Sequence, residues 1–263
     1  MLKVVLTIAG SDSSGGAGIQ ADLKTFSALG VFGASAVTAL TAQNTRGVLS
    51  VADLDAQFVA SQIEAVLDDL PVAAAKTGML SRTEIIEIVA QSVREFSIPN
   101  LVVDPVMVAA SGDLLLSLEA VAAMREHMFP LGVLVTPNLR EAEILLGREQ
   151  IDNPEAMRKA ARALVHIGAR AALVTGGALE GDAIDILYDG REVHEYKAPR
   201  HGPRAHGAGC TLSAAIAARL AMGDSLHEAI GAAKKFVTRA IEESPELGQG
   251  SRPLNHMVAT DKG

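Results

Sequence analysis

Residues 206–213, with the sequence His-Gly-Ala-Gly-Cys-Thr-Leu-Ser, join a glycine-rich turn to an alanine-rich helical pattern. Glycine leaves backbone N–H groups uncovered, and the first N–H groups of a helix have no partner within it. Together with the helix dipole, these groups form a site for an anion, most simply a phosphate. The only cysteine of the chain, Cys210, lies in this turn. Taken alone, the turn is better explained as a tight connection around a small buried thiol, so other residues must decide.

Polar and flexible side chains follow the apolar runs of the chain, where the strands of a sheet would end. In open α/β sheets, ligands bind beyond these carboxyl ends. Each residue also has a structural explanation: Asp104 before Pro105 can end a strand, and Asn138 can cap a following helix. Their shared position argues for a site, which the sequence places at Asp12, Gln43, Met79, Asp104, Asn138, Thr175 and the 207–210 turn.

Two further carboxylates have open interpretations. Glu141 lies three residues after Asn138 and fits a capping box as well as a metal ligand. Asp22 lies on the polar side of a predicted helix, where a solvated carboxylate is usual.

Apolar runs and helical patterns alternate along the chain. The runs predict strands over 3–9, 34–40, 72–76, 101–103, 133–135 and 171–174, and a hairpin over 184–188 and 192–196. Helical spacing predicts helices over 19–29, 58–70, 118–128, 154–167, 209–222 and 226–243, and Ser81 with Glu84 predicts a capping box before another helix. This order predicts a mostly parallel sheet with helices on both faces, a three-layer α/β/α fold. Since no linker is evident, we expect one domain over 1–263.

The composition excludes several function classes. The 263-residue chain has 49% hydrophobic residues, as expected of a folded globular protein, and a net charge of -8 without a basic tract. This charge argues against a nucleic acid or an anionic membrane as partner. One cysteine excludes a disulfide framework, and the apolar N-terminal run is too short to span a bilayer. We therefore expect a cytoplasmic protein.

An anion-binding turn, carboxylates suited to Mg²⁺ and a separate polar pocket together indicate phosphoryl transfer. The sequence contains no G-x-x-x-x-G-K-[ST] loop, no protein-kinase motif and no dinucleotide fingerprint. A nucleotide must therefore be bound by a different fold.

Six motifs occur in order along nearly the whole chain: AGSDSSGGAGIQADLK over 9–24, TAQNT over 41–45, KTGM over 76–79, VDPVM over 103–107, TPN with EAE over 136–143, and HGAGCTLS over 206–213. This set resembles the hydroxymethylpyrimidine/phosphomethylpyrimidine kinase family, the thiamine-pathway branch of the ribokinase-like superfamily. The resemblance implies a ribokinase-like fold and a bifunctional, ATP- and Mg²⁺-dependent kinase. Such an enzyme phosphorylates 4-amino-5-hydroxymethyl-2-methylpyrimidine and then its monophosphate. The resemblance also implies that the protein forms a homodimer.

The resemblance assigns roles to residues by motif. It implies a pyrimidine pocket of Asp22, Gln43, Met79 and Val106. It implies Mg²⁺ ligation by Asp104 and Glu141, and nucleotide contacts from Asn138 and Thr175. It implies an anion hole at Gly207, Ala208 and Gly209, with Cys210 in the catalytic-base position. We expect the helix N-terminus to lower the pKa of the Cys210 thiol.

Three positions depart from the family's pattern. Ala110 and Thr175 stand where lysine is usual, and Ala208 stands where threonine is usual. Losing two positive charges weakens phosphate binding unless Arg200 or Arg204 replaces them.

Three functions therefore stay open. The first is the pyrimidine kinase, which Gln43 and Met79 favour. The second is a pyridoxal-type kinase, whose acceptor is also a planar hydroxymethyl heterocycle. The third is a non-catalytic pyrimidine-binding homologue with impaired ATP binding.

Overall fold

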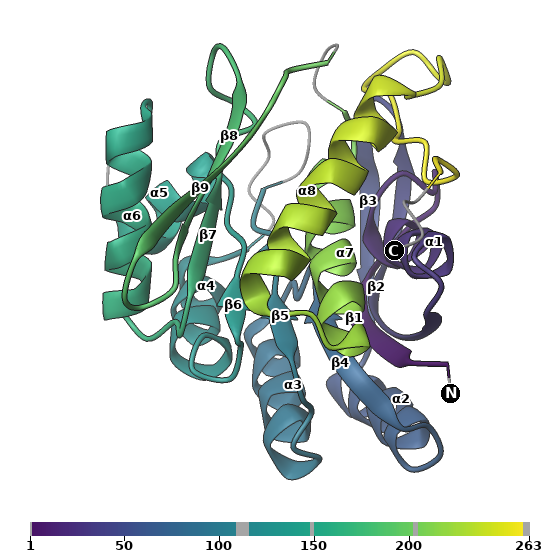
Figure 1. Ribbon diagram of the computed structural model, residues 1–263. Coiled ribbons are helices and arrows are strands. Elements are labelled where there is room, and N and C mark those ends of the chain that lie inside the picture. The colour runs from purple at the N-terminus through teal and green to yellow at the C-terminus, as the bar shows by residue number, and fades with distance from the viewer. Residues whose placement is uncertain (1, 109–115, 148–149, 202–204, 260–263) are drawn as a thin grey trace.

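A central sheet organises the protein in the computed structural model, which describes residues 2–108, 116–147, 150–201 and 205–259 (Figure 1). Its strand order is β3-β2-β1-β4-β5-β6-β7-β8-β9. The six strands from β2 to β7 run parallel, and β3, β8 and β9 pair antiparallel at the edges. The strands are β1 (Val4–Asp12), β2 (Phe32–Asn44), β3 (Gly47–Asp53), β4 (Val72–Thr77), β5 (Leu101–Val103), β6 (Leu134–Val135), β7 (Ala172–Thr175), β8 (Ala183–Tyr188) and β9 (Val193–Ala198).

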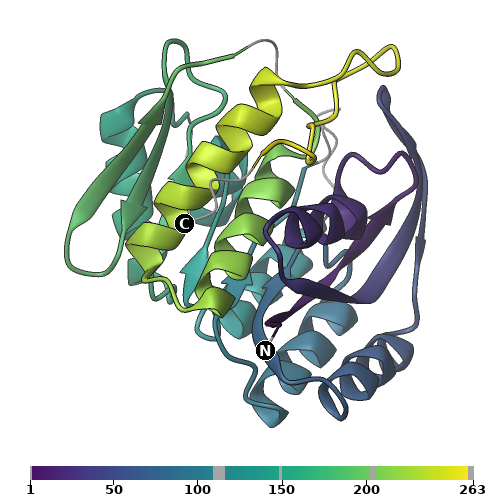
Figure 2. The ribbon, with the colours of Figure 1, turned by 45° about the vertical axis from the view of Figure 1, so that its right-hand side comes forward.

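Helices cover both faces of this sheet, as predicted (Figure 2). One apolar core joins the sheet to α1 (Gly18–Ala28), α7 (Ala208–Met222) and α8 (Leu226–Glu242). The other joins it to α2 (Ala56–Leu67), α3 (Thr83–Glu95), α4 (Leu118–Ala123), the π-helical turn η1 (Met124–Met128), α5 (Leu139–Leu146) and α6 (Pro154–His166). Neighbouring strand residues alternate between the cores, because side chains on a strand point to opposite faces. In the described part of the chain, no helix has both the length and the hydrophobicity that a bilayer crossing requires.

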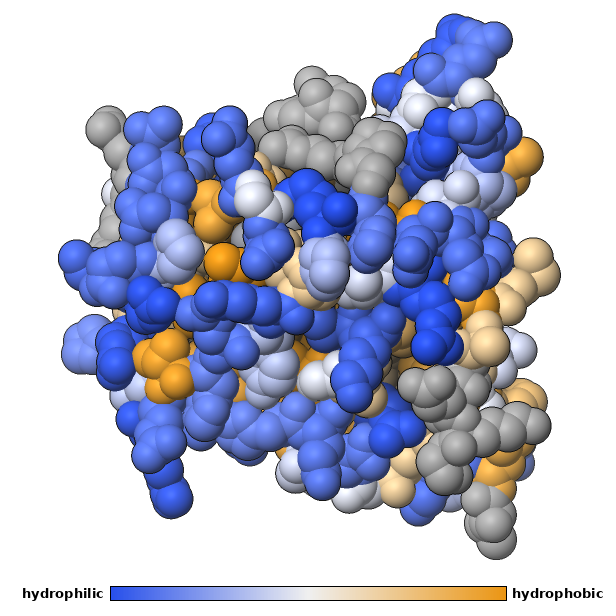
Figure 3. Space-filling model, turned by 45° about the horizontal axis from the view of Figure 1, so that its top comes forward, coloured by the Kyte–Doolittle hydropathy of each residue, from blue (hydrophilic) through white to orange (hydrophobic). Residues whose placement is uncertain are grey.

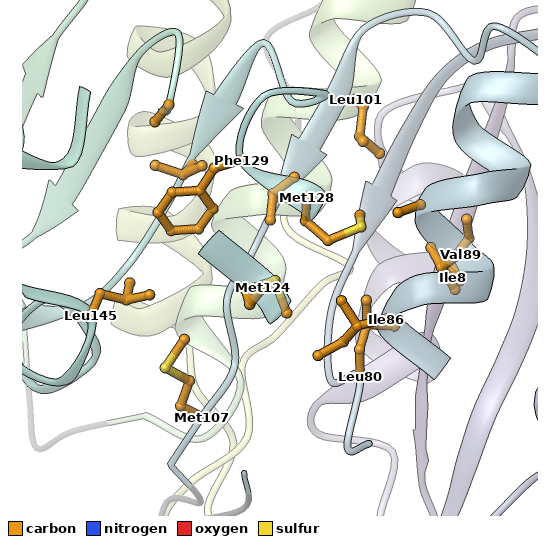
Figure 4. Close-up of a cluster of buried hydrophobic side chains, with 14 of the residues drawn as sticks. Ile8, Leu80, Ile86, Val89, Leu101, Met107, Met124, Met128, Phe129 and Leu145 are labelled. Atoms are coloured by element: carbon orange, nitrogen blue, oxygen red, sulfur yellow. The ribbon is translucent and has the colours of Figure 1, made fainter. Parts of the chain in front are cut away.

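Large apolar side chains fill the second core (Figure 4). Met107, Met124 and Phe129 have no exposed surface, and they occupy the same layer as Leu80 and Ile86. Burying one such side chain contributes roughly 1.5–3 kcal/mol of transfer free energy. This packing holds β5 and β6 in place, and both strands end at the edge where the predicted site residues lie.

Two predictions about local structure are wrong. The stretch 41–45 does not leave the sheet: β2 continues to Asn44 and pairs with β3, a strand that the sequence patterns did not predict. Ser81 does not cap α3, because its hydroxyl donates to the Asp53 carboxylate at the end of β3 and Arg82 takes the N-cap position. Both errors arise from β3, whose exposed side chains lack the apolar periodicity of a core strand.

The connection between β1 and α1 packs directly against the start of α7. Gly207 has φ +85°, and a Cβ there would lie 1.9 Å from the carbonyl oxygen of Gly16. Gly18 has φ +57°, and its Cβ would lie 2.4 Å from the oxygen of Gly10. Only glycine fits both positions, since a side chain would be strained and would collide with backbone. These contacts set the N-terminus of α7 beside the end of β1.

Candidate active site

One cavity of about 610 Å³ lies beyond the carboxyl ends of the parallel strands, at the start of α7. Figure 3 shows this side of the molecule, where polar side chains dominate the surface and apolar ones appear between them. The predicted site residues come together there, with the exception of Asp22. The cavity wall includes Gln43, Met79, Val106, Asp104, Asn138, Glu141, Thr175, Gly207, Ala208, Gly209 and Cys210.

The first turn of α7 presents backbone donors to this cavity. The N-cap is Gly207, and the first hydrogen bond within the helix runs from Thr211 N to Gly207 O at 2.9 Å. The N–H groups of Ala208, Gly209 and Cys210 precede that bond, so they have no partner inside the helix. Outside the neighbouring backbone, no heavy atom of the described residues lies within 4 Å of the position that a Cβ on Gly209 would take. The turn can therefore bind an anion through backbone groups, whatever side chain stands at Ala208.

A cluster of buried charged side chains underlies the anion-binding turn of residues 207–210, which we call the anion turn. Lys76, at the end of β4, has no exposed surface, and its ammonium group lies 2.9 Å from both carboxylate oxygens of Asp22. The same ammonium lies 3.8 Å from Asp104 Oδ2. Burial alone would lower the pKa of Lys76, but the negative charges of Asp22 and Asp104 outweigh it and raise the pKa. Lys76 is therefore a permanent positive charge at the base of the cavity.

Asp22 is the exception among the predicted pocket residues. Its carboxylate has no exposed surface, accepts a 2.6 Å hydrogen bond from Thr7 and pairs with Lys76. It is neither solvated nor part of the cavity wall. The structure thus corrects the predicted direct contact with a pyrimidine: Asp22 holds Lys76, and Lys76 lines the cavity.

Asp104 and Glu141 are buried carboxyl groups whose ionisation Lys76 does not fully compensate. Burial raises the pKa of Asp104, although Lys76 and a 2.9 Å hydrogen bond from Ser213 oppose the shift. Burial and the charge of Asp104 raise the pKa of Glu141 to about 8. Two buried carboxylates that disfavour each other's ionisation fit a divalent cation with oxygen ligands, such as Mg²⁺.

Asn138 and Glu141 form the capping box of α5. Asn138 Oδ1 accepts from Glu141 N at 3.0 Å, and Glu141 Oε2 accepts from Asn138 N at 2.9 Å. Glu141 Oε1 also accepts from Met107 N at 3.3 Å. The capping interpretation is therefore correct for both residues, and it also fixes their side chains on the cavity wall.

Gln43 contacts Thr41 and a buried pair formed by His206 and Asp12. Its Oε1 accepts from Thr41 at 3.0 Å, and its Nε2 lies 3.2 Å from His206 Nε2. The His206 nitrogen lies 2.9 Å from Asp12 Oδ2. Burial alone would raise the pKa of Asp12, but hydrogen bonds from His206, Ser14 and backbone N–H groups lower it to about 2. The anionic Asp12 accepts a hydrogen bond from His206 Nε2, so this nitrogen lies against the Gln43 amide without accepting a hydrogen bond from it.

The opposite wall carries Thr175, as predicted, together with an ion pair that no sequence pattern indicated. Asp185 on β8 accepts from Lys234 on α8 at 2.7 Å and from Gly176 N at 3.1 Å. Arg200 donates to the carbonyl oxygens of Gly177, Leu179 and Gly181 at 2.6–2.9 Å, so it holds the loop that follows β7. Ala110 and Arg204 lie outside the described residues.

The predicted lowering of the Cys210 pKa is wrong for this structure. Burial, with added repulsion from Asp104 and Asp22, raises the pKa of the thiol to about 12. Lys76 and the N–H of Gly18 act in the opposite direction but do not compensate. Because the loss of water is the largest contribution to this shift, Cys210 is a neutral thiol at pH 7.

Sequence reasoning placed Asp12 at the site without a specific role, and it gave no role to Lys76, His206, Asp185 or Lys234. A signal existed for Lys76, because a lysine that ends an apolar strand must find a buried partner. No comparable signal links Asp12 to His206, since 194 positions separate them.

The same motifs and site residues lie within a match to a known protein family. The sequence profile of the family described as phosphomethylpyrimidine kinase matches residues 12–255. The hydroxymethylpyrimidine/phosphomethylpyrimidine kinase of Rhizobium meliloti (strain 1021) is 52% identical over 260 residues, which cover 97% of each chain. The chain belongs to the phosphomethylpyrimidine kinase family. The resemblance inferred from the six motifs is thereby confirmed.

Two further proteins are similar to this chain. The thiamine biosynthesis bifunctional protein ThiED of Geobacter sulfurreducens is 51% identical over 98% of this chain, which spans only 53% of that longer protein. A Bacillus subtilis pyridoxal kinase, solved as an ADP complex, is 42% identical with a TM-score of 0.91, covering 97% of this chain and 98% of its own. The structural similarity confirms the ribokinase-like α/β fold.

The raised pKa of Glu141 predicts a pH-dependent stability. Between its ordinary pKa of 4.5 and about 8, Glu141 keeps a proton in the folded state that it loses on unfolding. The free energy of unfolding should therefore fall as the pH rises through this interval, by up to about 1.4 kcal/mol per pH unit. Glu141→Gln, which retains the capping oxygen, should flatten the profile in urea unfolding without Mg²⁺. Parallel profiles for the two proteins would contradict the assignment.

The raised pKa of Cys210 predicts slow alkylation. In the protein without ligands, iodoacetamide should react at pH 8 about a hundredfold more slowly than with an unperturbed thiol, because few thiolates form. The rate should keep rising with pH beyond pH 9, and Asp104→Asn should accelerate it at fixed pH by removing a repelling charge. Since Cys210 is the only cysteine, mass spectrometry reads the rate directly, and urea-unfolded protein is the control. A rate that levels off near pH 9 in the folded protein contradicts the account.

Proposed function

We propose that the chain uses ATP to phosphorylate the hydroxymethyl group of 4-amino-5-hydroxymethyl-2-methylpyrimidine, and then the resulting monophosphate, in thiamine biosynthesis. One observation carries this proposal: the anion turn, the paired carboxylates and a polar pocket wall share one cavity. The names of the Rhizobium meliloti kinase and of the Geobacter sulfurreducens thiamine protein support this acceptor. The Bacillus subtilis pyridoxal kinase was solved with ADP, which supports an adenine nucleotide as donor.

The carboxylate side of the cavity is where we place Mg²⁺ and the nucleotide phosphates. Asp104 and Glu141 would hold the ion, and their raised pKa values express a charge that a cation relieves. Bound Mg²⁺ would neutralise charge on the transferred phosphoryl group. Asn138 and Thr175 border this side, and a 3.0 Å bond from Thr175 N to Pro137 O joins their loops. We assign both residues to nucleotide contact.

The acceptor pocket lies on the Gln43 side. An amide presents both a donor and an acceptor, which matches the amino group and ring nitrogen of an aminopyrimidine. Met79 and Val106 supply apolar surface for a flat ring, and Met79 is fixed by a 2.7 Å bond from Thr38 to its carbonyl oxygen. Thr41 donates to the oxygen of the Gln43 amide, and the Asp12–His206 pair lies against the same amide.

The transfer itself would take place above the 207–210 turn. Backbone N–H groups there stabilise the charge of the phosphoryl group in the transition state. Cys210 is the proposed acceptor for the hydroxymethyl proton, and Lys76 stabilises its thiolate form. Balancing the charge of Asp104 removes the carboxylate that most raises the thiol pKa. The second acceptor is already an anionic phosphate, so it depends less on this base.

The alternative functions lead to different expectations. The similarity to a pyridoxal kinase with a TM-score of 0.91 favours pyridoxal as a second acceptor. A non-catalytic pyrimidine binder would bind the pyrimidine but not Mg-ATP. Arg200 argues against the latter function, because it lines the cavity and places a positive charge beside the loop after Thr175, where a family lysine is missing.

We also propose that the chain forms one kinase domain and assembles as a homodimer. Exposed apolar side chains on β2 and β3 support an interface, with Leu40 50% and Leu49 77% exposed. Large exposed apolar residues on neighbouring strands commonly mark contacts with another chain.

The decisive assay supplies Mg-ATP with either hydroxymethylpyrimidine or pyridoxal and measures ADP release. We expect the higher kcat/KM with the pyrimidine, and Cys210→Ala should lower kcat of the first phosphorylation by about 10²–10⁴-fold while pyrimidine binding by calorimetry persists. His166→Gln on α6, outside the cavity wall, is the matched control and should leave turnover unchanged.

Three outcomes would overturn parts of this proposal. No turnover above an enzyme-free control removes the pyrimidine kinase function. A higher kcat/KM for pyridoxal favours the second acceptor. Unchanged kcat in Cys210→Ala removes the base role while leaving the kinase function intact.

A further inference from the structure

Asp189, His194 and His227 meet at the edge of the sheet opposite the active site. The cavity lies at the carboxyl end of β7, where Thr175 pairs with Asp185 of β8. Because β8 runs antiparallel to β7, its end at Tyr188 pairs with Ala172, at the start of β7. Asp189 follows there, and Figure 2 shows the β8–β9 turn and the start of α8 at the same end of the molecule.

The three side chains have the spacing of a metal site. Asp189 Oδ2 lies 3.4 Å from His227 Nε2 and 3.6 Å from His194 Nε2. One ligand atom from each residue falls within 4.8 Å of the other two. Ligands about 2.0–2.1 Å from a tetrahedral Zn²⁺ are roughly 3.3 Å apart, close to the observed separations.

The hydrogen bonds around the cluster leave these atoms available. Asp189 Oδ1 accepts from Arg191 N at 2.8 Å and Glu192 N at 2.7 Å, which directs Oδ2 toward the histidines. His227 Nδ1 lies 3.1 Å from the Tyr196 hydroxyl, which orients the ring with Nε2 toward Asp189. A second partner of this kind is usual for a metal-bound histidine.

His194 supplies an independent observation. Its Nε2 atom is buried and has no hydrogen-bond partner among the residues that the structure describes. A buried polar atom without a partner is unfavourable, and a metal ion at the centre of the cluster would satisfy it. Its ring packs edge-on against His227 with centroids 4.2 Å apart, which places both rings around one point.

We propose that Asp189, His194 and His227 bind a transition-metal ion of the Zn²⁺ class, with an open position for water or another ligand. Two imidazoles and one carboxylate suit Zn²⁺ or Co²⁺, whereas Mg²⁺ requires oxygen ligands. The site is therefore chemically distinct from the carboxylate pair of Asp104 and Glu141.

Metal binding at this site would join the β8–β9 hairpin to α8. His227 lies in the first turn of α8, and Lys234, seven residues later and roughly 10 Å along the axis, pairs with Asp185 on the cavity wall. The metal and this ion pair would hold the same helix against the same hairpin at both ends. The ion would thus stabilise the wall that includes Asp185 and Lys234.

The test measures Zn²⁺ binding by calorimetry in excess Mg²⁺, which occupies the active-site carboxylates. We expect one Zn²⁺ per wild-type chain, a raised Tm, and intense visible absorption of the Co²⁺ form typical of tetrahedral coordination. His194→Gln, His227→Gln and Asp189→Asn should each weaken binding by about tenfold or more, and Asp189→Asn preserves the turn acceptor Oδ1. His166→Gln serves as the control and should bind as wild type.

The opposite results overturn the proposal. If the wild-type protein binds no Zn²⁺ in excess Mg²⁺, the cluster of Asp189, His194 and His227 does not bind a metal. Equal affinity in wild type and in folded variants, verified by circular dichroism, places the bound ion elsewhere.

Discussion

The buried ammonium group of Lys76 is the charge on which the active site depends. It lies 2.9 Å from Asp22 and 3.8 Å from Asp104, with no exposed surface on Lys76 or Asp22. The attraction within such a pair rarely exceeds the free energy lost when both ions leave water, so stability alone does not explain the pair. Its position explains it better: Asp22 neutralises and directs Lys76, which then sets the electrostatic potential at Asp104 and Cys210.

The negative charges around Lys76 are only partly neutralised, and this incomplete neutralisation is a functional property of the site. Burial keeps the pKa values of Asp22, Asp104 and Glu141 raised, although Lys76 opposes the shifts of Asp22 and Asp104. Burial, with added repulsion from Asp104 and Asp22, raises the pKa of Cys210 and keeps its thiol protonated. A site with excess buried negative charge is prepared for a divalent cation, and its cysteine responds to that cation through Asp104. The acidic residues and the thiol thus act as one electrostatic unit.

The sequence predicted the position of this site better than its internal contacts. Strand ends of a parallel sheet meet at one edge, so Asp104, Asn138 and Thr175 could be placed there from apolar runs alone. The 207–210 turn could be predicted because glycine and helix termini have local rules. Asp22 could not be predicted as a buried partner of Lys76, because 54 positions separate the two residues.

The errors in the prediction share this physical origin. The Cys210 pKa was predicted from a local rule about helix N-termini, but burial and two carboxylates from distant segments determine it. Strand β3 was missed because it packs at an exposed edge, where the apolar periodicity is weak. Local sequence patterns therefore predicted most helices and strands and the sheet edge that carries the site. The charge balance of the buried groups could not be predicted, because it depends on contacts between distant segments.

A double-mutant cycle on Lys76 and Asp22 tests whether the two buried charges depend on each other. The free energies of unfolding of Lys76→Met, Asp22→Asn and the double variant would be measured in urea at pH 7 without Mg²⁺. Each single change leaves a buried charge without its partner and should cost about 3–5 kcal/mol. The double variant should be less destabilised than the sum of the two by about 2 kcal/mol or more. Additive effects would contradict the account, because they would show that Lys76 and Asp22 do not depend on each other.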